Sequence, residues 1–453
     1  MGLKFDVIVV GAGASGMTAA IQLARGGAFT AVLEAGGIAG KKLLATGNGK
    51  CNFTNSVQEL ECYRGGRPQA AMELLEQYSV DTILSFFDGI GIYPAQKNGY
   101  WYPNSYQAAS VREALEQELI CAGAKLYLYC SVKKIRRLKD NRGRFEVLAV
   151  RKKPESKDKY SSGRKKELDE FKEEEVRFFA DYIVLACGGQ AGGTNPACGS
   201  GYLLAEALGL SIIKPVPALV QLKIREKVCR QLSGVRLAAE GKLVLPNKVY
   251  RERGEFLFTD YGISGIPSMQ LSRFVSVLFY REEMERDLRI ERNTSDGDRC
   301  EFQLFLDFFP DKEENDLVKM LNDRFLRFPA RDIAGVLLGL FPAKLNAVLA
   351  AMVSKPQKER LKLTTAEKLA CIIKRFPLTV YGTNAFESAQ VTAGGVDMKE
   401  LTPYTMEAKQ IKGLYVTGEL ADMDGTCGGY NLHWAWMSGM AAAEDILKKC
   451  NYK

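Results

Sequence analysis

A glycine-rich turn near the N-terminus constrains this chain more than any other feature. An apolar run from Phe5 to Val10 leads into the turn at residues 11–16, and a second apolar segment, residues 30–33, ends at Glu34. A strand, a glycine-rich turn, a helix and a second strand that ends in an acid together form a dinucleotide-binding βαβ unit. The sequence therefore predicts an α/β fold that begins with a Rossmann-type parallel sheet.

The glycines of this turn have separate expected roles. Gly11 permits a tight turn out of the strand, Gly13 leaves room for a pyrophosphate, and Gly16 lets the helix pack closely on the sheet. The pyrophosphate would lie at the helix N-terminus, and Glu34 would accept hydrogen bonds from a ribose diol. The contacts predicted here are Gly11, Ala12, Gly13, Ala14, Ser15, Gly16, Glu34 and Ala35.

Two later strand ends favour FAD over a nicotinamide cofactor as the resident dinucleotide. One predicted strand, residues 182–186, runs into a Cys-Gly-Gly turn, and another, residues 413–416, is followed by Gly418 and Glu419. Ligands bind outside the carboxyl ends of parallel strands. A nicotinamide site does not need a C-terminal segment that returns to this edge of the sheet, as residues 413–419 would. We add Ala186, Gly188, Gly189, Gly418 and Glu419 to the predicted cofactor contacts.

Length and composition indicate a two-domain globular enzyme. The chain has 453 residues, of which 46% are hydrophobic and 26% charged. It contains no apolar run of about 18 residues and no visible secretory signal, so a cytoplasmic protein with no membrane partner is expected. The eleven cysteines include no CxxC pair, which favours reduced thiols and predicts no metal site.

The chain is basic, and this charge raises the question of a nucleic-acid partner. Lysine and arginine outnumber aspartate and glutamate by 62 to 54, a net charge of +8. Residues 151–177 contain many charges of both signs, a pattern that predicts a solvated loop within a β-meander. No aromatic RNA-binding motif or clustered basic helix is present. A nucleic-acid partner is therefore not expected.

The order of the segments predicts a discontinuous FAD-binding domain. Residues 1–195 and 378–453 would form this domain, with a β-rich substrate domain at 196–310 and a helical subdomain at 311–377 inserted between them.

Local patterns within the insertion support this division. Strands are expected near residues 242–245 and 302–307, where apolar and polar residues alternate. Two apolar stripes at helical spacing are expected to belong to the core: Leu317, Leu321, Phe325 and Leu326, then Ile333, Val336, Leu337 and Leu340.

Four segments spread over the chain resemble one flavoprotein family. They are residues 40–52, residues 258–265, residues 391–396 and residues 418–436. The family includes aminoacetone oxidases and the flavin reductases implicated in bile-acid metabolism, and it is related to the glutathione-reductase and fumarate-reductase flavin folds. The resemblance implies a two-dinucleotide-binding-like fold and noncovalent FAD. A chain with a single histidine, His433, offers little for a covalent flavin link.

The first of these segments is suited to wrapping an extended ligand. Its glycines and asparagines give the backbone freedom, and Lys42 and Lys50 can offset phosphate charge. The predicted contacts are Lys41, Lys42, Thr46, Gly47, Asn48, Gly49, Lys50, Cys51 and Asn52, with Val132 added from a separate strand.

The last segment predicts a helix whose N-terminus points at the flavin. Glycines 428 and 429 precede the apolar stripe of the final helix. Unpaired N–H groups and the helix dipole there would favour negative charge on the reduced ring. The predicted cofactor contacts are Asp424, Gly428, Gly429, Tyr430 and Asn431.

No residue is identified as the catalytic acid or base. The family commonly has a histidine where this chain has Asp260, and an arginine where it has Tyr100, so the substrate is open. Aromatic residues at 100–102 could line an apolar slot, although alternate residues of a strand face opposite sides. The catalytic candidates are Tyr100, Tyr102, Asp260, Tyr430 and Asn431.

Cys51, Cys187 and Cys427 lie in cofactor-facing motifs, but the paired thiols of a disulfide reductase are missing. We expect these cysteines to act as small apolar side chains. His433 is expected to be a packed core residue.

The sequence favours an FAD-dependent reductase acting on a small molecule. The donor would be NADH or NADPH, written together as NAD(P)H, and it would bind transiently because no second GxGxxG is present. Hydride would pass through flavin N5 to an activated C=C of a hydrophobic organic acceptor. The alternative is an FAD oxidase of a small amine or amino ketone that uses dioxygen. A flavin-bearing RNA-binding or RNA-modification protein and a non-catalytic redox sensor rank lower, and the oligomeric state is open.

Overall fold

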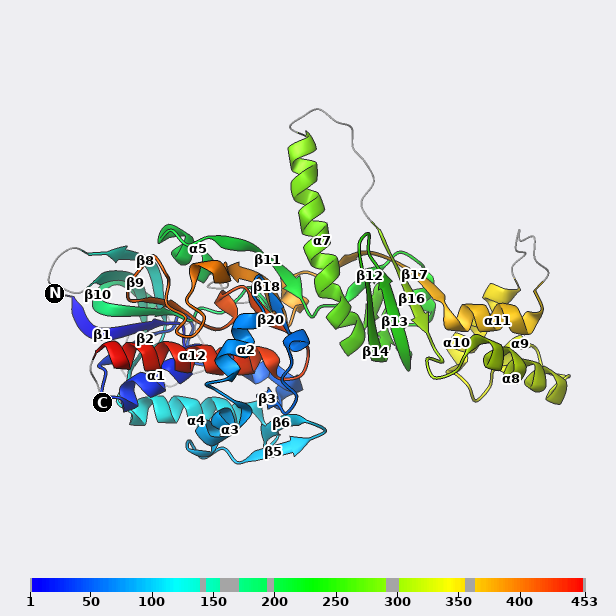
Figure 1. Ribbon diagram of the computed structural model, residues 1–453, viewed down its shortest axis with the longest axis horizontal. Helices are drawn as coiled ribbons and strands as arrows, with labels where there is room; N and C mark the ends of the chain where they lie inside the picture. Colours follow the sequence, from blue (N-terminus) through cyan, green and yellow to red (C-terminus); the bar gives the residue numbers. More distant parts are fainter. Residues whose placement is uncertain are drawn as a thin grey trace, which may run out of the picture. The chain divides into compact units, whose positions relative to one another are not determined.

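A computed structural model describes residues 2–138, 144–154, 171–193, 199–290, 301–354 and 363–450 (Figure 1). The chain divides into two compact units, Met1–Pro215 with Val391–Lys453, and Val216–Gln390.

These unit boundaries differ from the predicted junctions near residues 195 and 378. Strand β11 (Ile212–Ala218) pairs with β18 (Val391–Val396), so most of β11 belongs with the first unit. Strand β17 (Phe376–Thr383) closes the barrel of the second unit, which delays the return of the chain to residue 391.

The first unit is built on a mixed sheet in the order β7-β2-β1-β10-β9-β8, with β19 also paired to β10. The pairs of β1 with β2, β1 with β10, β2 with β7 and β10 with β19 are parallel, and β8, β9 and β10 pair in antiparallel fashion. The strands are β1 (Leu3–Val10), β2 (Thr30–Leu33), β7 (Lys125–Tyr127), β8 (Cys130–Arg137), β9 (Phe145–Pro154), β10 (Phe171–Leu185) and β19 (Leu414–Val416). This sheet is the predicted Rossmann-like core. Residues 155–170, within the charge-mixed stretch, lie outside the described residues.

Close helix packing explains a glycine in the C-terminal helix. Helix α1 (Ala14–Arg25) packs against α12 (Tyr430–Lys449) and α4 (Ala108–Cys121), and Figure 1 shows the three running side by side. A Cβ on Gly439 of α12 would lie 2.5 Å from the Ser15 carbonyl oxygen. The absence of a side chain at Gly439 therefore lets the two helices approach closely.

Short elements surround this core. They are η1 (Lys41–Gly49), β3 (Thr54–Asn55), η2 (Leu60–Cys62), β4 (Tyr63–Gly65), α2 (Gln69–Leu75), α3 (Val80–Asp88), β5 (Pro94–Lys97), β6 (Tyr100–Pro103), α5 (Ser200–Ala207), η4 (Met398–Glu400), η5 (Gly418–Leu420) and β20 (Met423–Gly425). Strand β20 pairs with β4, and β6 pairs with both β3 and β5.

The second unit contains a closed barrel in the order β12-β15-β14-β13-β16-β17. Its strands besides β17 are β12 (Leu222–Ile224), β13 (Arg236–Val244), β14 (Val249–Phe258), β15 (Gly262–Ser264) and β16 (Phe302–Asp307). Its helices are α6 (Val228–Gln231), α7 (Ile266–Ile290), α8 (Glu314–Arg327), α9 (Ile333–Val336), α10 (Ala343–Val353) and α11 (Thr365–Lys374), with η3 at Phe386–Ser388. The strand expected at residues 302–307 is confirmed.

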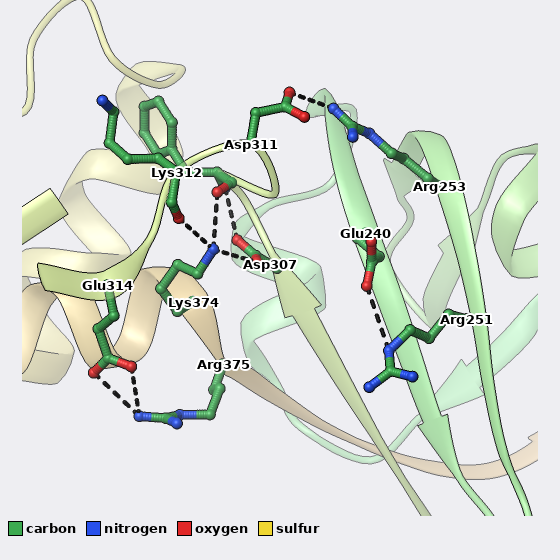
Figure 2. A network of polar contacts seen from close by, with 10 residues as sticks. Glu240, Arg251, Arg253, Asp307, Asp311, Lys312, Glu314, Lys374 and Arg375 are labelled. Atoms are coloured by element: carbon green, nitrogen blue, oxygen red, sulfur yellow. Dashed lines mark hydrogen bonds and ion pairs between the residues drawn. The ribbon is translucent and has the colours of Figure 1, made fainter. Parts of the chain in front are cut away.

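A half-buried lysine joins the helices of this unit to its barrel (Figure 2). The Lys374 ammonium at the end of α11 lies 2.6 Å from the Asp307 carboxylate and donates to the carbonyls of Phe309 and Lys312 at 2.9 and 2.7 Å. The Lys374 side chain is only 15% exposed, so this junction is largely shielded from water.

One predicted core position is wrong. Leu317 and Leu321 are fully buried in α8, but Leu326 is 80% exposed. Leu326 follows Leu317 by nine residues, about half a turn around an α-helix axis, and so lies on the opposite face. The helix that contains the second apolar stripe, Ile333 to Leu340, is shorter than the stripe, because α9 ends at Val336.

Among the described residues, no helix combines the length and apolar character needed to cross a membrane.

Candidate functional site

Three strand ends meet at one edge of the main sheet. Val10 at the end of β1 is in register with Leu185 of β10, and Leu185 is in register with Val416 of β19. The turns that follow these strands therefore leave the sheet side by side, as the sequence predicts. This edge is where parallel α/β sheets hold their ligands.

The glycines of the first turn meet different surroundings. A Cβ on Gly16 would lie 2.0 Å from the Gly11 carbonyl oxygen, and one on Gly11, whose φ is +104°, would lie 2.5 Å from the Ala186 carbonyl oxygen. A Cβ on Gly13 would meet no heavy atom of the described chain within 4 Å. Gly11 and Gly16 are therefore required by packing, whereas Gly13 borders open space at the start of α1. This space fits the pyrophosphate of a dinucleotide.

The Glu34 carboxylate is fixed against this turn. Its two oxygens accept hydrogen bonds from the backbone N–H of Ala12 at 2.9 Å and of Gly36 at 2.7 Å. A carboxylate oxygen has a further lone pair, so Glu34 can still accept from a ribose hydroxyl. Val132 is the third residue of β8, and the first residue of this strand, Cys130, donates its backbone N–H to the Glu34 carbonyl. Ala35 follows in a half-buried loop.

Glu419 is the centre of a second cluster. Its carboxylate accepts from the Lys42 ammonium at 2.9 Å, the Gly189 N–H at 3.2 Å and the Thr392 N–H at 2.8 Å. Burial raises the pKa of Glu419, but Lys42 and these N–H groups outweigh burial and hold it below its usual value. Glu419 is therefore a fixed negative charge between η1, β18 and the end of β10.

The loops around Glu419 are held by residues that sequence reasoning missed. The Thr392 hydroxyl accepts from the N–H groups of Gln190 and Ala191. Ser438 accepts from the Gly418 N–H, and the Trp434 indole N–H donates to the Gly418 carbonyl, both at 3.0 Å. A buried hydroxyl in an apolar segment is the signal that could have identified Thr392.

Left-handed backbone is concentrated in the segment that follows Thr46. The φ angles are +56° at Gly47, +54° at Asn48, +81° at Gly49 and +56° at Cys51. Such conformations are costly for non-glycine residues, collect at ligand-binding segments, and can form anion-binding nests of N–H groups. Residues 47–50 and Lys41 are exposed, whereas Cys51 and Asn52 are buried.

The start of α12 lies against this segment. Gly428 and Gly429 have φ of +133° and +94°, and a Cβ on Gly429 would lie 2.9 Å from both the Thr54 carbonyl oxygen and the Asn52 Oδ1. The first turn of α12 contains no acidic side chain, so its positive end is not neutralised from within the helix.

The five catalytic candidates lie in different places, some buried and some exposed. Asn431 is occupied, because its amide exchanges hydrogen bonds with the backbone N–H and carbonyl of Gly425 at 2.8 and 2.9 Å. Tyr430 is buried and packs edge-on against Tyr63 with ring centroids 5.9 Å apart. Asp260 belongs to the second unit, where it is exposed.

Tyr100 and Tyr102 line a hollow of about 210 Å³ in the first unit, together with Lys50, Lys97, Asn98 and Tyr106. A Cβ on Gly428 would lie 3.2 Å from the Tyr100 ring and 3.0 Å from the Tyr430 ring. The structure therefore brings Tyr100 and Tyr430 together at the start of α12. Asp424 is buried in β20, opposite Arg64 of β4.

Burial shifts the pKa of Cys51, Cys187 and His433 towards the uncharged form of each side chain. Burial raises the pKa of Cys51 and of Cys187 to about 12, so both are protonated thiols. None of the described cysteines forms a disulfide. The buried His433 ring lies 2.6 Å from the Thr54 hydroxyl, and burial lowers its pKa to about 4. The prediction that His433 is a core residue is confirmed.

Comparison with known families gives one match over almost the entire chain. The family model described as "HI0933-like protein Rossmann domain" matches residues 5–445.

Several characterised proteins are similar to this chain over their full length. The chain is 38% identical to a 3-dehydro-bile acid delta(4,6)-reductase of Clostridium scindens, over 96% of this chain and 98% of that protein. It is 29% and 26% identical to ribosomal RNA dihydrouridine synthases of Haemophilus influenzae and Escherichia coli, over 98% of this chain and 98% of each relative.

Proposed function

Because this chain belongs to the HI0933-like Rossmann-domain family and is an FAD-dependent oxidoreductase, we propose that it reduces an activated C=C bond of a hydrophobic organic acceptor with NAD(P)H as donor. The observation that supports this most directly is the 38% identity, along the full length of both chains, to a reductase whose name specifies two double-bond positions.

The more distant relatives support the same bond chemistry. Dihydrouridine is uridine with two hydrogens added across one C=C bond of the base, so the names of these relatives also describe reduction of a C=C bond next to a carbonyl. A hydride acceptor of this kind is consistent with a site that offers N–H groups and a helix N-terminus to developing negative charge.

We assign the noncovalent FAD to the sheet edge of the first unit. Gly13 and the start of α1 would accept the pyrophosphate, Glu34 the ribose, and the left-handed segment at residues 46–52 the extended part of the molecule. When bound, FAD supplies hydride transfer between donor and acceptor. All predicted cofactor residues lie in the first unit.

The chain's own residues would orient the cofactor and the acceptor and would stabilise charge on them. Glu419 holds the start of η1 through Lys42 and the turn after β10 through Gly189, and its ionised carboxylate remains able to accept from a ligand hydroxyl. The N–H groups at the start of α12 would stabilise negative charge. Asn431 would act as a positioning residue, because its amide holds the loop before Gly428.

The test is anaerobic mixing of the purified holoenzyme with NADH or NADPH while the visible flavin absorbance is followed. We expect bleaching by one nicotinamide, fast recovery on adding a 3-oxo-Δ4 steroid enone, and slow recovery in air. Bleaching by a small amine or amino ketone, with none by either nicotinamide, would instead establish the oxidase reaction and reject the reductase.

A second candidate acceptor is a uridine in RNA. The full-length similarity to the two dihydrouridine synthases favours it, and the net charge of +8 is compatible with it. The same reduced holoenzyme would be mixed with ribosomal RNA and the RNA digested for dihydrouridine. Formation of dihydrouridine, together with no oxidation of the flavin by enones, would select this acceptor.

A further inference from the structure

We propose that the hollow lined by Lys50, Lys97, Asn98, Tyr100, Tyr102 and Tyr106 is an anion subsite that holds the carboxylate-bearing end of the organic acceptor. This inference rests on the proposed reductase function and adds to it the chemical class of the substrate and the residues that recognise it. Lys97 and Lys50 are its cations, and the tyrosines are its apolar walls.

The hollow is built on a well-defined hairpin. Asn98 and Gly99, with φ of +52° and +86°, form the two-residue turn between β5 and β6, which is the arrangement that Asn-Gly favours. The turn places Lys97 directly opposite Tyr100. Alternation along β6 then puts Tyr100 and Tyr102 on the hollow side and Trp101 on the other, where its indole N–H donates to Ser56 at 2.9 Å.

The charge of the hollow is uncompensated. Lys50 and Lys97 are exposed, and neither forms an ion pair or a side-chain hydrogen bond with any part of the chain that the structure describes. No carboxylate is among the lining residues. Lys42 differs, because Glu419 already neutralises it at 2.9 Å. Two ammonium groups that no described carboxylate neutralises are suited to an anion. In this proposal the Lys50 side chain serves the acceptor, while the backbone of residues 46–52 stays with the FAD.

The volume and the walls define what kind of anion fits. About 210 Å³ is below the range of roughly 300–1,000 Å³ that encloses a whole drug-sized ligand, so the hollow holds one end of a larger molecule. The Tyr102 and Tyr106 rings lie 5.3 Å apart and offer an apolar surface to the adjoining carbon skeleton. A carboxylate on a hydrophobic body matches this combination.

The position of the hollow is also suitable for binding the far end of the acceptor. The Tyr100 ring, one of its walls, abuts Gly428 at the start of α12, which the proposed function places beside the flavin. The hollow therefore borders the reaction site without occupying it, as expected for a subsite that orients a long acceptor by its far end.

The experiment compares an acid with its neutral ester on the holoenzyme. Initial rates would be measured with 3-oxochol-4-en-24-oic acid and with its methyl ester, for the wild type, Lys97→Met and Lys97→Arg. Lys125→Met is the matched control, since Lys125 is an exposed lysine of β7, which pairs with β2, and it is not among the residues that line the hollow. We expect Lys97→Met to raise KM for the acid about tenfold, the loss of one charge-assisted hydrogen bond. The ester's KM and both kcat values should be unchanged, and Lys97→Arg should restore binding of the acid.

A binding measurement separates this inference from the reductase proposal. Saturated 5β-cholan-24-oic acid, which offers no C=C bond, would be titrated into the oxidised holoenzyme while the flavin spectrum is recorded. If the wild type reduces no enone but binds this acid in a Lys97-dependent way, the subsite stands and the proposed reaction fails. If Lys97→Met changes acid and ester equally, or changes neither, the subsite is overturned.

An RNA phosphate is the competing source of the anion. A short uridine-rich oligonucleotide would be added in competition with the cholanic acid. Displacement of the acid, with a larger effect of Lys97→Met on the oligonucleotide than on the acid, would overturn the carboxylate assignment.

Discussion

Individual glycines of the first turn are subject to different physical constraints. At Gly16 a side chain would collide with the Gly11 carbonyl oxygen at 2.0 Å, so the constraint is internal packing. At Gly13 the space is open and φ is −84°, so neither packing nor backbone strain requires glycine. Under the proposed assignment of FAD to this edge, the requirement at Gly13 comes from the ligand.

The substitution Gly13→Val should separate cofactor binding from folding. We expect the dissociation constant for FAD to rise on the order of a hundredfold, about 2.7 kcal/mol, because the new side chain fills the space assigned to the pyrophosphate. The unfolding free energy of the apoprotein should fall by no more than about 1 kcal/mol, the cost of a less favourable N-cap residue at the start of α1. Flavin fluorescence titration and calorimetry of the apoprotein measure the two quantities.

Gly16→Ala is the matched comparison. Its methyl group would collide with backbone, so overpacking should destabilise the apoprotein by about 1–3 kcal/mol. Equal losses of apoprotein stability in both variants would contradict the division of roles.

The buried position of His433 predicts that the free energy of unfolding depends on pH. Its pKa is about 4 in the folded chain against a usual 6.5, mainly because of burial. Between these values the unfolded chain binds a proton that the folded chain does not, so the stability contributed by neutral His433 is complete above pH 6.5 and is lost as the pH falls towards 4. The size is on the order of 3 kcal/mol.

The variant His433→Asn keeps a polar group near Thr54 but does not titrate. We expect the wild type to lose more unfolding free energy than the variant between pH 7 and pH 4, measured by urea denaturation across that range. Since the chain has one histidine, parallel pH profiles for the two proteins would show that folding does not lower the pKa of His433.

Elements of this protein are joined by polar side chains at their ends rather than by apolar contact alone. In the first unit Glu419 ties η1, β18 and the turn after β10 together. In the second unit Lys374 joins the end of α11 to β16 and the loop after it (Figure 2). Both groups satisfy donors or acceptors that strand and helix ends leave open.

The junction at Lys374 should be sensitive to substitution. Lys374→Met would remove an ion pair and two hydrogen bonds at a site where the Lys374 and Asp307 side chains are 15% and 21% exposed. We expect a loss of about 2–3 kcal/mol in the unfolding free energy, measured by urea denaturation with circular dichroism.

Arg253→Gln is its control in the same network. The Arg253–Asp311 pair shown in Figure 2 is mostly exposed, 54% and 79%, and exposed pairs contribute little. We expect no measurable change for this variant. If it destabilised the protein as much as Lys374→Met, shielding from water would not be what makes the Lys374 junction strong.

At the scale of the whole molecule, the second unit is an insertion with neighbouring ends. The Gln390 N–H donates to the Leu219 carbonyl at 3.3 Å, so the chain leaves and returns at almost the same point. Every residue assigned to FAD lies outside this insertion.

Replacing residues 220–389 by a two-residue glycine turn should therefore leave a protein that binds FAD. We expect close to one FAD per chain, measured from the absorbance of the purified protein. A folded product, verified by circular dichroism, that binds no FAD would show that the second unit contributes to the cofactor site.

The sequence by itself determined the parts of this protein that depend on local pattern. Strand β1, the turn at residues 11–16 and strand β16 are set by apolar alternation and by glycine spacing within a few residues. The meeting of the ends of β1, β10 and β19 could also be inferred, because parallel strands align their carboxyl ends.

Only the tertiary structure decided which side chains meet. Lys42 and Glu419 are separated by 377 positions yet form an ion pair, the Asn431 amide bonds the backbone of Gly425, and Lys97 and Lys50 line one hollow. Such partners depend on how distant segments pack, and a periodicity or motif contains only short-range information. Leu326 is a different case, because its nine-residue spacing from Leu317 already places it on the opposite helix face and could have excluded it from the core stripe.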